Sequence, residues 1–536
     1  MSDPQPSGTT ALSRRLSAHP RLAALVLGAL AACGFPPLGL WPLTLLGVAG
    51  LVWLVARTDR LRSAFFIGWL WGFAHLTLAN NWIATAFTHQ AKMPAFLGWF
   101  AVPALCLYLA LYPGFAALAA RWLARRFLTG DRRDTATLGI ALAGSWIVFE
   151  WLRGWVFTGY PWPPLGLAFL GDFGTPGLAV VLPWMGTYAL SGLLVLLATG
   201  LLVAFLARRW LVGGAALAVI AALMLVPAGK GADGTLPYTL VQPNLTQAQL
   251  NDSSQYEQQF LDYAALSRPR REGLERRLVL WPEGAIPDYL REGYPQRFYT
   301  AMTAGGDPAY ARRRIGEAIG PDSVLLTGAQ DLELEGDTLV GARNSVTAID
   351  GNGTILGGYD KAHLVPYGEY LALRWLLEPL GAQRLVAGSI DFLPGPGPRT
   401  LDLGAHGRAG IQICYEIVFS GQVVDRDARP DYIVAPSVDG WFGSWGPPQH
   451  LAQARMRAIE EGLPVLRSTT SGISAIIDAR GVVRQHIGMW EQGRLDGIVP
   501  PAFEETAFAR FGNALALAWA ALLIGLSLVA SRRRDG

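Results

Sequence analysis

The sequence predicts an α-helical membrane domain of eight transmembrane helices, with one α/β domain inserted before the last helix. Three observations support this prediction: long stretches without a charged residue, arginines concentrated in every second connection between them, and a later segment of short β-like runs. The composition agrees, because charged residues make up only 16% of the 536 residues, against about 25% in soluble globular proteins. It argues against a disordered protein, a coiled coil and an ordinary cytosolic enzyme. The net charge of +3 is too small to indicate a nucleic-acid-binding protein.

Seven stretches of the chain contain no charged residue, and a transmembrane helix needs about 20 apolar residues. The first stretch should hold two helices, because residues 34–39 (GFPPLG) interrupt it near its middle. Eight helices result, seven of them before residue 230 and one at the C-terminal end. The stretches are residues 22–56, 63–91, 93–120, 135–149, 173–207, 210–229 and 511–531.

Arginines near the ends of these stretches predict the orientation, since basic residues favour the cytoplasmic side. The basic clusters fall in alternate connections, whereas the other connections carry little positive charge, mainly Lys92 and Arg153. Both termini are therefore predicted to be cytoplasmic. The predicted domains are a membrane domain at 1–229, an extracytoplasmic domain at 230–507, and a last helix with a cytoplasmic tail at 508–536. The clusters are Arg14, Arg15 and Arg21; Arg57, Arg60 and Arg62; Arg121, Arg125, Arg126, Arg132 and Arg133; Arg208 and Arg209; and Arg532, Arg533 and Arg534.

The N-terminal region allows a rival interpretation. Residues 30–33 (LAAC), after an Arg-bearing start, resemble a bacterial lipoprotein signal with Cys33 as the lipidated residue. A mature lipoprotein would continue into a polar linker, whereas a second apolar stretch begins at once here. Cleavage would also spoil the alternation of the basic clusters, so we expect an uncleaved first helix.

Beyond about Pro237 the sequence changes to short β-like runs that alternate with helix-like stretches, which is typical of an α/β domain. Residues 350–353 (DGNG) and 478–481 (DARG) have the composition of hairpin turns, so we expect a mixed sheet. The expected strands are residues 238–242, 278–281, 323–328, 344–349, 409–414, 432–435 and 473–477, and the expected helices are 254–265, 308–319 and 449–461.

Three side chains that can carry chemistry lie at the ends of expected strands of this domain or directly after them. Cys414 is the only cysteine outside the predicted spans, so it has no disulfide partner in the chain and is either a buried small hydrophobe or a nucleophile. Glu283 follows an apolar run that ends in Trp281-Pro282. Lys361 is one of only three lysines among 44 basic residues. A compact ammonium suits a point-like oxyanion better than a guanidinium does, although chance retention of a surface lysine would also explain it.

The motifs around these residues resemble the nitrilase superfamily, whose catalytic set is a Glu, a Lys and a Cys at strand ends of an αββα sandwich. The matching segments are 281–283 (WPE), 360–366 (DKAHLVP) and 413–416 (ICYE), in the family's order. Ser437-Val438-Asp439 departs from the family pattern, which usually has Asn at the middle position. Further motifs resemble the bacterial apolipoprotein N-acyltransferase family: residues 365–370 (VPYGEY), 440–443 (GWFG), 446–450 (GPPQH), 454–458 (ARMRA) and 466–470 (LRSTT).

The resemblance implies a reaction and its site residues. Cys414 would attack an ester of a membrane phospholipid and keep the acyl chain as a thioester, with Glu283 as the base. Lys361 and backbone amides at Cys414 would stabilise the oxyanion. The acyl acceptor would be the α-amine of the N-terminal diacylglyceryl-cysteine of an apolipoprotein. We further expect a monomer in the bacterial inner membrane, with a periplasmic catalytic domain and neither a cofactor nor a metal.

Several other polar residues keep two interpretations each. Glu369 is either a second carboxylate near Lys361 and Cys414 or a surface acid. Glu416, which with Tyr415 directly follows the nucleophile, either shapes the pocket or forms an ion pair. Glu150 and Arg153, at i, i+3 spacing, either pair with each other or contact a phospholipid headgroup.

An aromatic loop and a nearby apolar segment are candidates for the substrate entrance. The aromatic residues either line a path for the acyl chain or pack on the domain's own core. Residues 371–380 are apolar enough to dip into the bilayer as a lid. His363 and His450 are expected to be structural, since no further His or Cys completes a metal coordination set. The aromatic residues are Trp441, Phe442 and Trp445.

Two other functions compete with acyl transfer. A membrane-anchored amidase, hydrolysing a lipid or peptide amide, would use every catalytic residue named above, but one helix would suffice as its anchor. A transporter with a degenerate binding domain would not need an intact Glu, Lys and Cys set, and the predicted spans hold few charges.

Overall fold

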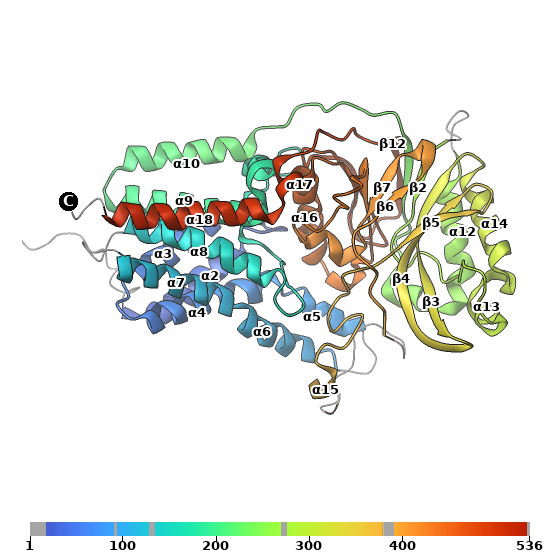
Figure 1. Ribbon diagram of the computed structural model, residues 1–536, viewed down its shortest axis with the longest axis horizontal. Helices are drawn as coiled ribbons and strands as arrows, with labels where there is room; N and C mark the ends of the chain where they lie inside the picture. The colour runs from blue at the N-terminus through green and yellow to red at the C-terminus, as the bar shows by residue number, and fades with distance from the viewer. Residues whose placement is uncertain are drawn as a thin grey trace, which may run out of the picture.

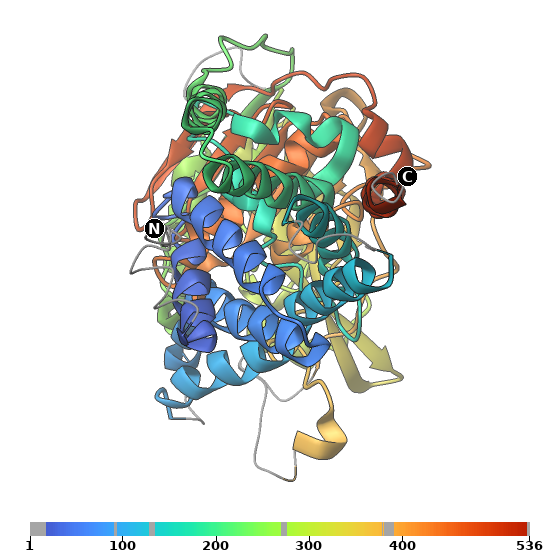
Figure 2. The ribbon, with the colours of Figure 1, turned by 90° about the vertical axis from the view of Figure 1, so that its left-hand side faces the viewer.

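The computed structural model describes residues 18–89, 94–127, 135–269, 276–377, 379 and 391–532. It has two parts arranged along its long axis (Figure 1). A bundle of helices, coloured blue to green and joined by the red C-terminal helix α18, forms one end, and a β-rich part forms the other. Seen from the end of the bundle, the helices lie in front of the strands (Figure 2).

The helical region contains at least one helix in each apolar stretch of the sequence. The first stretch is divided between α2 and α3, as its GFPPLG motif predicts. Of the basic residues used to predict the orientation, Arg14, Arg15, Lys92, Arg132, Arg133, Arg533 and Arg534 lie outside the described residues. The helices are α2 Pro20–Ala32, α3 Trp41–Ala56, α4 Leu61–Ala79, α5 Ile83–Ala86, α6 Leu97–Leu109, α7 Leu111–Phe127, α8 Thr135–Arg153, α9 Leu182–Leu206, α10 Trp210–Leu225 and α18 Asn513–Arg532.

Length and hydropathy allow three helical segments of the described chain to cross a membrane. These are Leu97–Ala124, which includes most of α6 and α7, Thr135–Arg153 and Gly177–Leu206. Four further apolar helices are shorter: Pro20–Ala32, Trp41–Ala56, Trp210–Leu225 and Asn513–Val529. The apolar helical region is therefore present, while eight transmembrane helices and their orientation remain predictions.

The β-rich part contains two six-stranded sheets, ordered β12-β1-β2-β3-β4-β5 and β11-β10-β9-β8-β7-β6. Both are mixed. In the first sheet β1, β2 and β3 run parallel, while β4 and β5 form an antiparallel hairpin around residues 350–353. In the second sheet β7, β8 and β9 run parallel, while β6 and β10 pair antiparallel with β7 and β9. A second hairpin, β10–β11, turns at 478–481, so both predicted turns are confirmed. The strands are β1 Pro237–Gln242, β2 Leu278–Leu280, β3 Val324–Glu335, β4 Thr338–Asp350, β5 Ile355–Asp360, β6 Thr400–Asp402, β7 Arg408–Ile411, β8 Tyr432–Ser437, β9 Val465–Thr469, β10 Ser474–Ile477, β11 Val483–Ile487 and β12 Gly493–Ile498.

The two sheets pack face to face and are covered by helices on their outer sides, which gives the expected αββα sandwich. Alternation along the strands explains the layers, because successive side chains point to opposite faces. Leu280 lies in the core between the sheets, together with Ile411 of the second sheet. Its neighbour Val279 packs outward with Ile315 of a covering helix. The helices of this part are α11 Gln247–Leu250, α12 Tyr256–Ser267, α13 Gln296–Met302, α14 Pro308–Ile319, α15 Arg374–Leu377, α16 Gly446–Glu461 and α17 Ala507–Phe511.

Helix α16 covers the second sheet on the side that faces the helical region. Glu460, near its C-terminal end, is buried and accepts hydrogen bonds from the backbone nitrogen and the hydroxyl of Thr187, both at 2.7 Å. Thr187 follows Gly186, whose φ of 72° interrupts α9. The carboxylate therefore caps the second part of α9 and fastens the sandwich to the helical region.

Candidate active site

Glu283, Lys361 and Cys414 come together at one end of the sandwich, although 131 residues separate the first from the last (414 − 283). Glu283 follows β2, Lys361 directly follows β5, and Cys414 opens the 3-10 helix η8 (Cys414–Val418) after β7. Lys361 Nζ lies 3.4 Å from Glu283 Oε1. Val438, next to the Ser437 that contacts the thiol, donates its N–H to Glu283 Oε2 at 2.8 Å.

Cys414 occupies a strained turn. Its φ is +53°, in the left-handed region that residues other than glycine rarely adopt. His450 Nε2 donates to the Cys414 carbonyl oxygen at 3.0 Å and so holds this backbone. The Ser437 hydroxyl lies 3.3 Å from Cys414 Sγ and 2.6 Å from Asp439 Oδ1. A nucleophile raised on a sharp turn after a strand is a common arrangement in α/β enzymes.

Burial and neighbouring charges set the protonation states of the site. Burial raises the pKa of the Cys414 thiol and the Glu283 carboxylate raises it further, while Lys361 and the Ser437 hydroxyl act in the opposite direction. Burial disfavours the Lys361 ammonium, but the carboxylates of Glu369 and Glu283 outweigh it and hold its pKa above the usual range. The surroundings therefore favour the protonated form of the Cys414 thiol and the charged form of the Lys361 ammonium.

Glu369 belongs to this cluster and is not a surface acid. Only 5% of it is exposed, and its carboxylate lies 3.0 Å from Lys361 Nζ. The backbone N–H of Val365 donates to Glu369 Oε2 at 2.8 Å, which fixes the loop after Lys361. This second carboxylate is the main cause that raises the pKa of Lys361.

Asn344 is a member of the site that the sequence interpretation missed. Its side-chain amide donates to Glu283 Oε1 at 2.7 Å and to Glu369 Oε1 at 2.9 Å. The backbone carbonyl of Asn344 accepts a hydrogen bond from the backbone N–H of Lys361 at 2.8 Å. Pairing of Ser345 with Asp360 places Asn344 opposite Lys361. A register shift between Ala348 and Ile349 moves this pairing by one residue, so counting back from the DGNG turn would have pointed to Arg343 instead.

Glu416 ties the Lys361 loop to the Cys414 turn. Its carboxylate accepts hydrogen bonds from the Tyr359 hydroxyl at 2.7 Å and from three backbone N–H groups. Burial raises the pKa of Glu416 to about 7 in spite of these donors. The residue next to it, Tyr415, is buried and donates its hydroxyl to the Gly159 carbonyl at 3.3 Å. The three backbone donors are Ala362, His363 and Ile413.

The aromatic loop packs between the two parts of the molecule. Phe442, which ends the 3-10 helix η9 (Asp439–Phe442), lies 4.8 Å from Trp82 of the helical region, measured between ring centroids. Trp441 lies 5.6 Å from His89 in the same sense. Trp445 packs partly buried on the core beneath α16. The predicted lid coincides with α15, but residues 378 and 380 of it lie outside the described residues.

The fold and the site define the class of protein, a carbon–nitrogen hydrolase domain attached to a helical region. Residues 240–502 match the family model described as carbon-nitrogen hydrolase, and residues 27–200 match the one described as apolipoprotein N-acyltransferase N-terminal domain. An amidase from Nesterenkonia sp. AN1 is similar at 17% identity and a TM-score of 0.34, covering 51% of this chain and 94% of the amidase.

Three curated relatives narrow the class to one family. Apolipoprotein N-acyltransferases of Rhodopseudomonas palustris and Bradyrhizobium diazoefficiens are 34% and 36% identical, over 95% and 96% of this chain and 95% of each relative. That of Caulobacter vibrioides is 32% identical over 96% of this chain and 94% of the relative. The chain belongs to the apolipoprotein N-acyltransferase family.

Proposed function

We propose that this protein transfers a fatty acyl chain from a membrane phospholipid to the α-amine of the N-terminal diacylglyceryl-cysteine of apolipoproteins, through a thioester on Cys414. Membership of the family makes the protein an acyltransferase. The observation that carries the chemistry is the buried contact of Lys361 with Glu283 and Glu369, next to the strained turn of Cys414.

In the first half-reaction, Cys414 Sγ attacks the ester carbonyl carbon of the phospholipid. Glu283 takes the thiol proton as the carbon–sulfur bond forms, which a protonated thiol requires. An ammonium has three donors; two face Glu283 and Glu369, and the third is available to the tetrahedral oxyanion. The carbon–oxygen bond then breaks, and Glu283 returns the proton to the departing lysophospholipid.

In the second half-reaction, the free amine of the acceptor attacks the thioester carbonyl. Glu283 removes a proton from the amine nitrogen, and Lys361 again stabilises the oxyanion. The carbon–sulfur bond breaks, the amide product leaves, and Glu283 restores the proton to the thiolate of Cys414. The two substrates thus react in turn, which gives ping-pong kinetics.

The helical region supplies the route by which membrane substrates reach this site. Its apolar helices pack against the aromatic loop of Trp441, Phe442 and Trp445, and we propose that this loop borders the entrance for the acyl chain. We further propose a monomer in the inner membrane with both termini cytoplasmic and the sandwich periplasmic. The alternation of the basic clusters supports this orientation.

Mass spectrometry of the intact protein tests the proposal. Incubation with phospholipid alone should add one fatty acyl chain to the wild-type protein and none to Cys414→Ala. Adding a diacylated lipopeptide should then remove the adduct and yield triacylated peptide. An unmodified wild-type protein, or an equal adduct on Cys414→Ala, would contradict the thioester mechanism. Release of free fatty acid instead of triacylated peptide would identify a hydrolase.

A further inference from the structure

One loop of the helical region contacts the sandwich beside the proposed site. This docking loop, residues 154–165, joins α8 to the 3-10 helix η2 (Leu165–Phe169). It makes three side-chain hydrogen bonds with the sandwich. His363 Nε2 donates to the Thr158 carbonyl at 3.0 Å, the Tyr415 hydroxyl donates to the Gly159 carbonyl at 3.3 Å, and Trp162 Nε1 donates to Gln449 Oε1 at 2.8 Å.

Each of these bonds ends on a residue that lies next to a group of the site. His363 follows Lys361 by two residues, and Tyr415 directly follows Cys414. Gln449 precedes His450, whose ring holds the Cys414 carbonyl. The position of the docking loop is therefore transmitted to the ammonium and to the nucleophile.

The sequence of the docking loop explains why it needs outside support. Residues 160–164 read YPWPP, so three of the five have no backbone N–H to donate. The carbonyl groups of such a segment must find donors elsewhere. Arg153, at the end of α8, supplies them: its guanidinium donates to the carbonyls of Pro163 at 2.8 Å, Trp162 at 3.4 Å and Pro161 at 3.5 Å.

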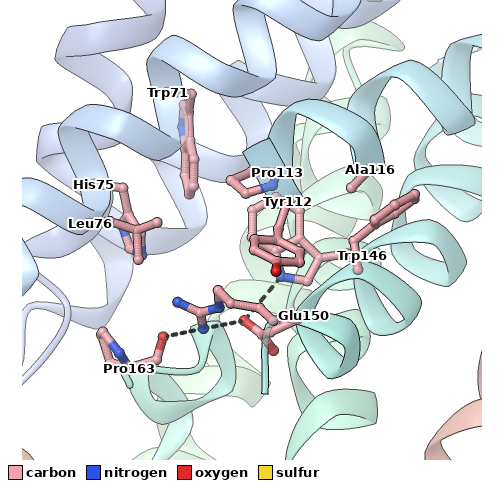
Figure 3. A pocket seen from close by; sticks show the side chains of 11 residues that line it. Trp71, His75, Leu76, Tyr112, Pro113, Ala116, Trp146, Glu150 and Pro163 are labelled. Atoms are coloured by element: carbon pink, nitrogen blue, oxygen red, sulfur yellow. Dashed lines mark hydrogen bonds and ion pairs between the residues drawn. The ribbon is translucent and has the colours of Figure 1, made fainter. Parts of the chain in front are cut away.

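Glu150 completes this arrangement one turn earlier on α8. Its Oε1 atom lies 3.7 Å from Arg153 Nη2 and accepts the backbone N–H of Leu165 at 2.8 Å and Trp146 Nε1 at 3.3 Å. Figure 3 shows Glu150 between Trp146 and Pro163, with dashed lines for its hydrogen bond from Trp146 and for the ion pair. Both ends of the proline-rich segment are thus held by one ion pair.

The ion pair that the sequence predicts between Glu150 and Arg153 is present, and little space adjoins it. The cavity beside it, lined by His75, Tyr112 and Trp146 among others, has a volume of about 20 Å³. Such a volume holds about one water molecule. A charge pair buried among apolar helices is expensive, and the order it imposes on the docking loop is the compensation visible here.

We propose that Arg153 is a positioning residue for both half-reactions: its guanidinium holds the docking loop in the conformation that places Lys361 and Cys414 through His363 and Tyr415. The inference rests on the proposed function. It assigns to a helix end of the membrane-embedded region a role in the chemistry of the sandwich.

Single-turnover kinetics in detergent test this role. Arg153→Gln should slow acylation of Cys414 by phospholipid, and also acyl transfer to lipopeptide, each by about tenfold to a hundredfold. The KM for phospholipid should stay within about twofold of the wild-type value, because no substrate contact is removed. Arg153→Lys should retain an intermediate rate. The matched control is Arg121→Gln, which removes another buried arginine of the helical region, remote from the docking loop.

A double-mutant cycle with Tyr415→Phe tests the path of this effect. If Arg153 acts through the loop, Arg153→Gln should cost less rate in the Tyr415→Phe background than in the wild type. The inference would be overturned if the rate losses of the two substitutions were additive. It would also be overturned if Arg153→Gln raised the KM with an unchanged turnover, or slowed the first half-reaction and left the second one normal. Should Arg153→Gln not fold, Trp162→Phe loosens the same loop without touching the ion pair and should slow both half-reactions, and its wild-type rates would overturn the role.

The failure of this inference can be told from the failure of the proposed function. Both use the same acylation assay on the wild-type protein. If the wild type forms the acyl adduct and Arg153→Gln forms it at the same rate, only the positioning role is wrong. If the wild type forms no adduct, the thioester mechanism itself is wrong.

Discussion

The sandwich and the helical region both bury charged side chains, but they surround them differently. In the sandwich, Lys361 has two carboxylates, at 3.0 and 3.4 Å. In the helical region, Arg153 has one carboxylate at 3.7 Å and three backbone carbonyls. The carboxylates of Glu283 and Glu369 hold the pKa of Lys361 above its usual range, whereas the carbonyls bonded to Arg153 belong to a backbone segment that the guanidinium holds in place. The two buried cations thus differ in their partners, in line with the reacting role proposed for Lys361 and the supporting role proposed for Arg153.

The contact between the two parts follows the pattern of the helical region. Arg455 of α16 donates to four carbonyls, and three of them belong to the segment that leads to α9. Burial lowers the pKa of Arg455 to about 10, which still leaves it charged. Buried cations at this contact therefore order backbone segments of the other part. The acceptors are the carbonyls of Gly171, Asp172, Thr175 and Gly481.

Lys361→Arg should have the largest effect on the acylation rate. The substitution keeps the positive charge of the side chain and changes only its shape. The ammonium is 1% exposed and fits between two carboxylates. A planar guanidinium cannot occupy that site and present a single donor to the oxyanion. We expect acylation of Cys414 to slow by about 10²-fold to 10³-fold, the usual effect of losing an oxyanion donor.

The matched control for this change is Lys230→Arg, which makes the same substitution at an exposed lysine of the linker. Its acylation rate should equal that of the wild type. A Lys361→Arg variant with a near wild-type rate would show that the cluster needs a positive charge only, as the supporting clusters do.

Glu460→Ala should have the next largest effect, on stability rather than on chemistry. It removes a buried carboxylate that accepts three hydrogen bonds and lies 2.8 Å from Arg457. Breaking a buried ion pair typically destabilises a protein by about 3 to 5 kcal/mol. Thermal unfolding in detergent should show this loss, with the acylation rate at low temperature preserved. Glu504→Gln, at an exposed carboxylate, is the control.

Asn344→Ala tests whether a neutral side chain contributes to the charged cluster of the sandwich. Two hydrogen bonds to Glu283 and Glu369 are lost. Both carboxylates keep their contacts with Lys361 and with backbone donors. We expect kcat/KM for lipopeptide acylation to fall by about tenfold to a hundredfold. Asn352→Ala, in the exposed turn between β4 and β5, should leave it unchanged, and an equal rate in both variants would remove Asn344 from the site.

The sequence was sufficient for those features that depend on neighbours along the chain. The alternation of strands and helices, the two hairpin turns and the positions of Glu283, Lys361 and Cys414 after strands all depend on residues close in sequence, and the αββα sandwich is confirmed. Catalytic roles for these residues remain predictions, as does the number of membrane spans.

Features made by distant pairs could not be predicted. Glu460 caps a helix 273 residues away, and no local pattern around Thr187 indicates a carboxylate partner. The contact of Tyr415 with the docking loop joins residues 256 positions apart. Asn344 lies opposite Lys361 because the hairpin register shifts by one residue between Ala348 and Ile349, and the turn sequence does not indicate that shift.

Glu461→Gln is the smallest expected effect and compares the contact between the two parts directly with the site. Burial raises the pKa of Glu461 to about 7, and the neighbouring Glu460 adds to it. A folded-state pKa above the unfolded value gives stability that is present below about pH 4.5 and is lost as the pH rises to about 7. The neutral glutamine has no such loss, but it buries an amide that needs partners, so a gain of about 1 kcal/mol at about pH 8 is expected.

The same change at Glu416 should have the opposite outcome, although burial raises its pKa to about 7 as well. Its carboxylate accepts hydrogen bonds from three backbone N–H groups and from the Tyr359 hydroxyl. The NH₂ group of a glutamine would face some of these donors and could not accept from them. Thermal unfolding at about pH 4.5 and pH 8 should therefore show Glu461→Gln gaining on the wild type as the pH rises, and Glu416→Gln destabilised at both values. Identical pH profiles for the two variants would mean that the hydrogen-bond partners of Glu416 and Glu461 do not determine how each substitution changes stability.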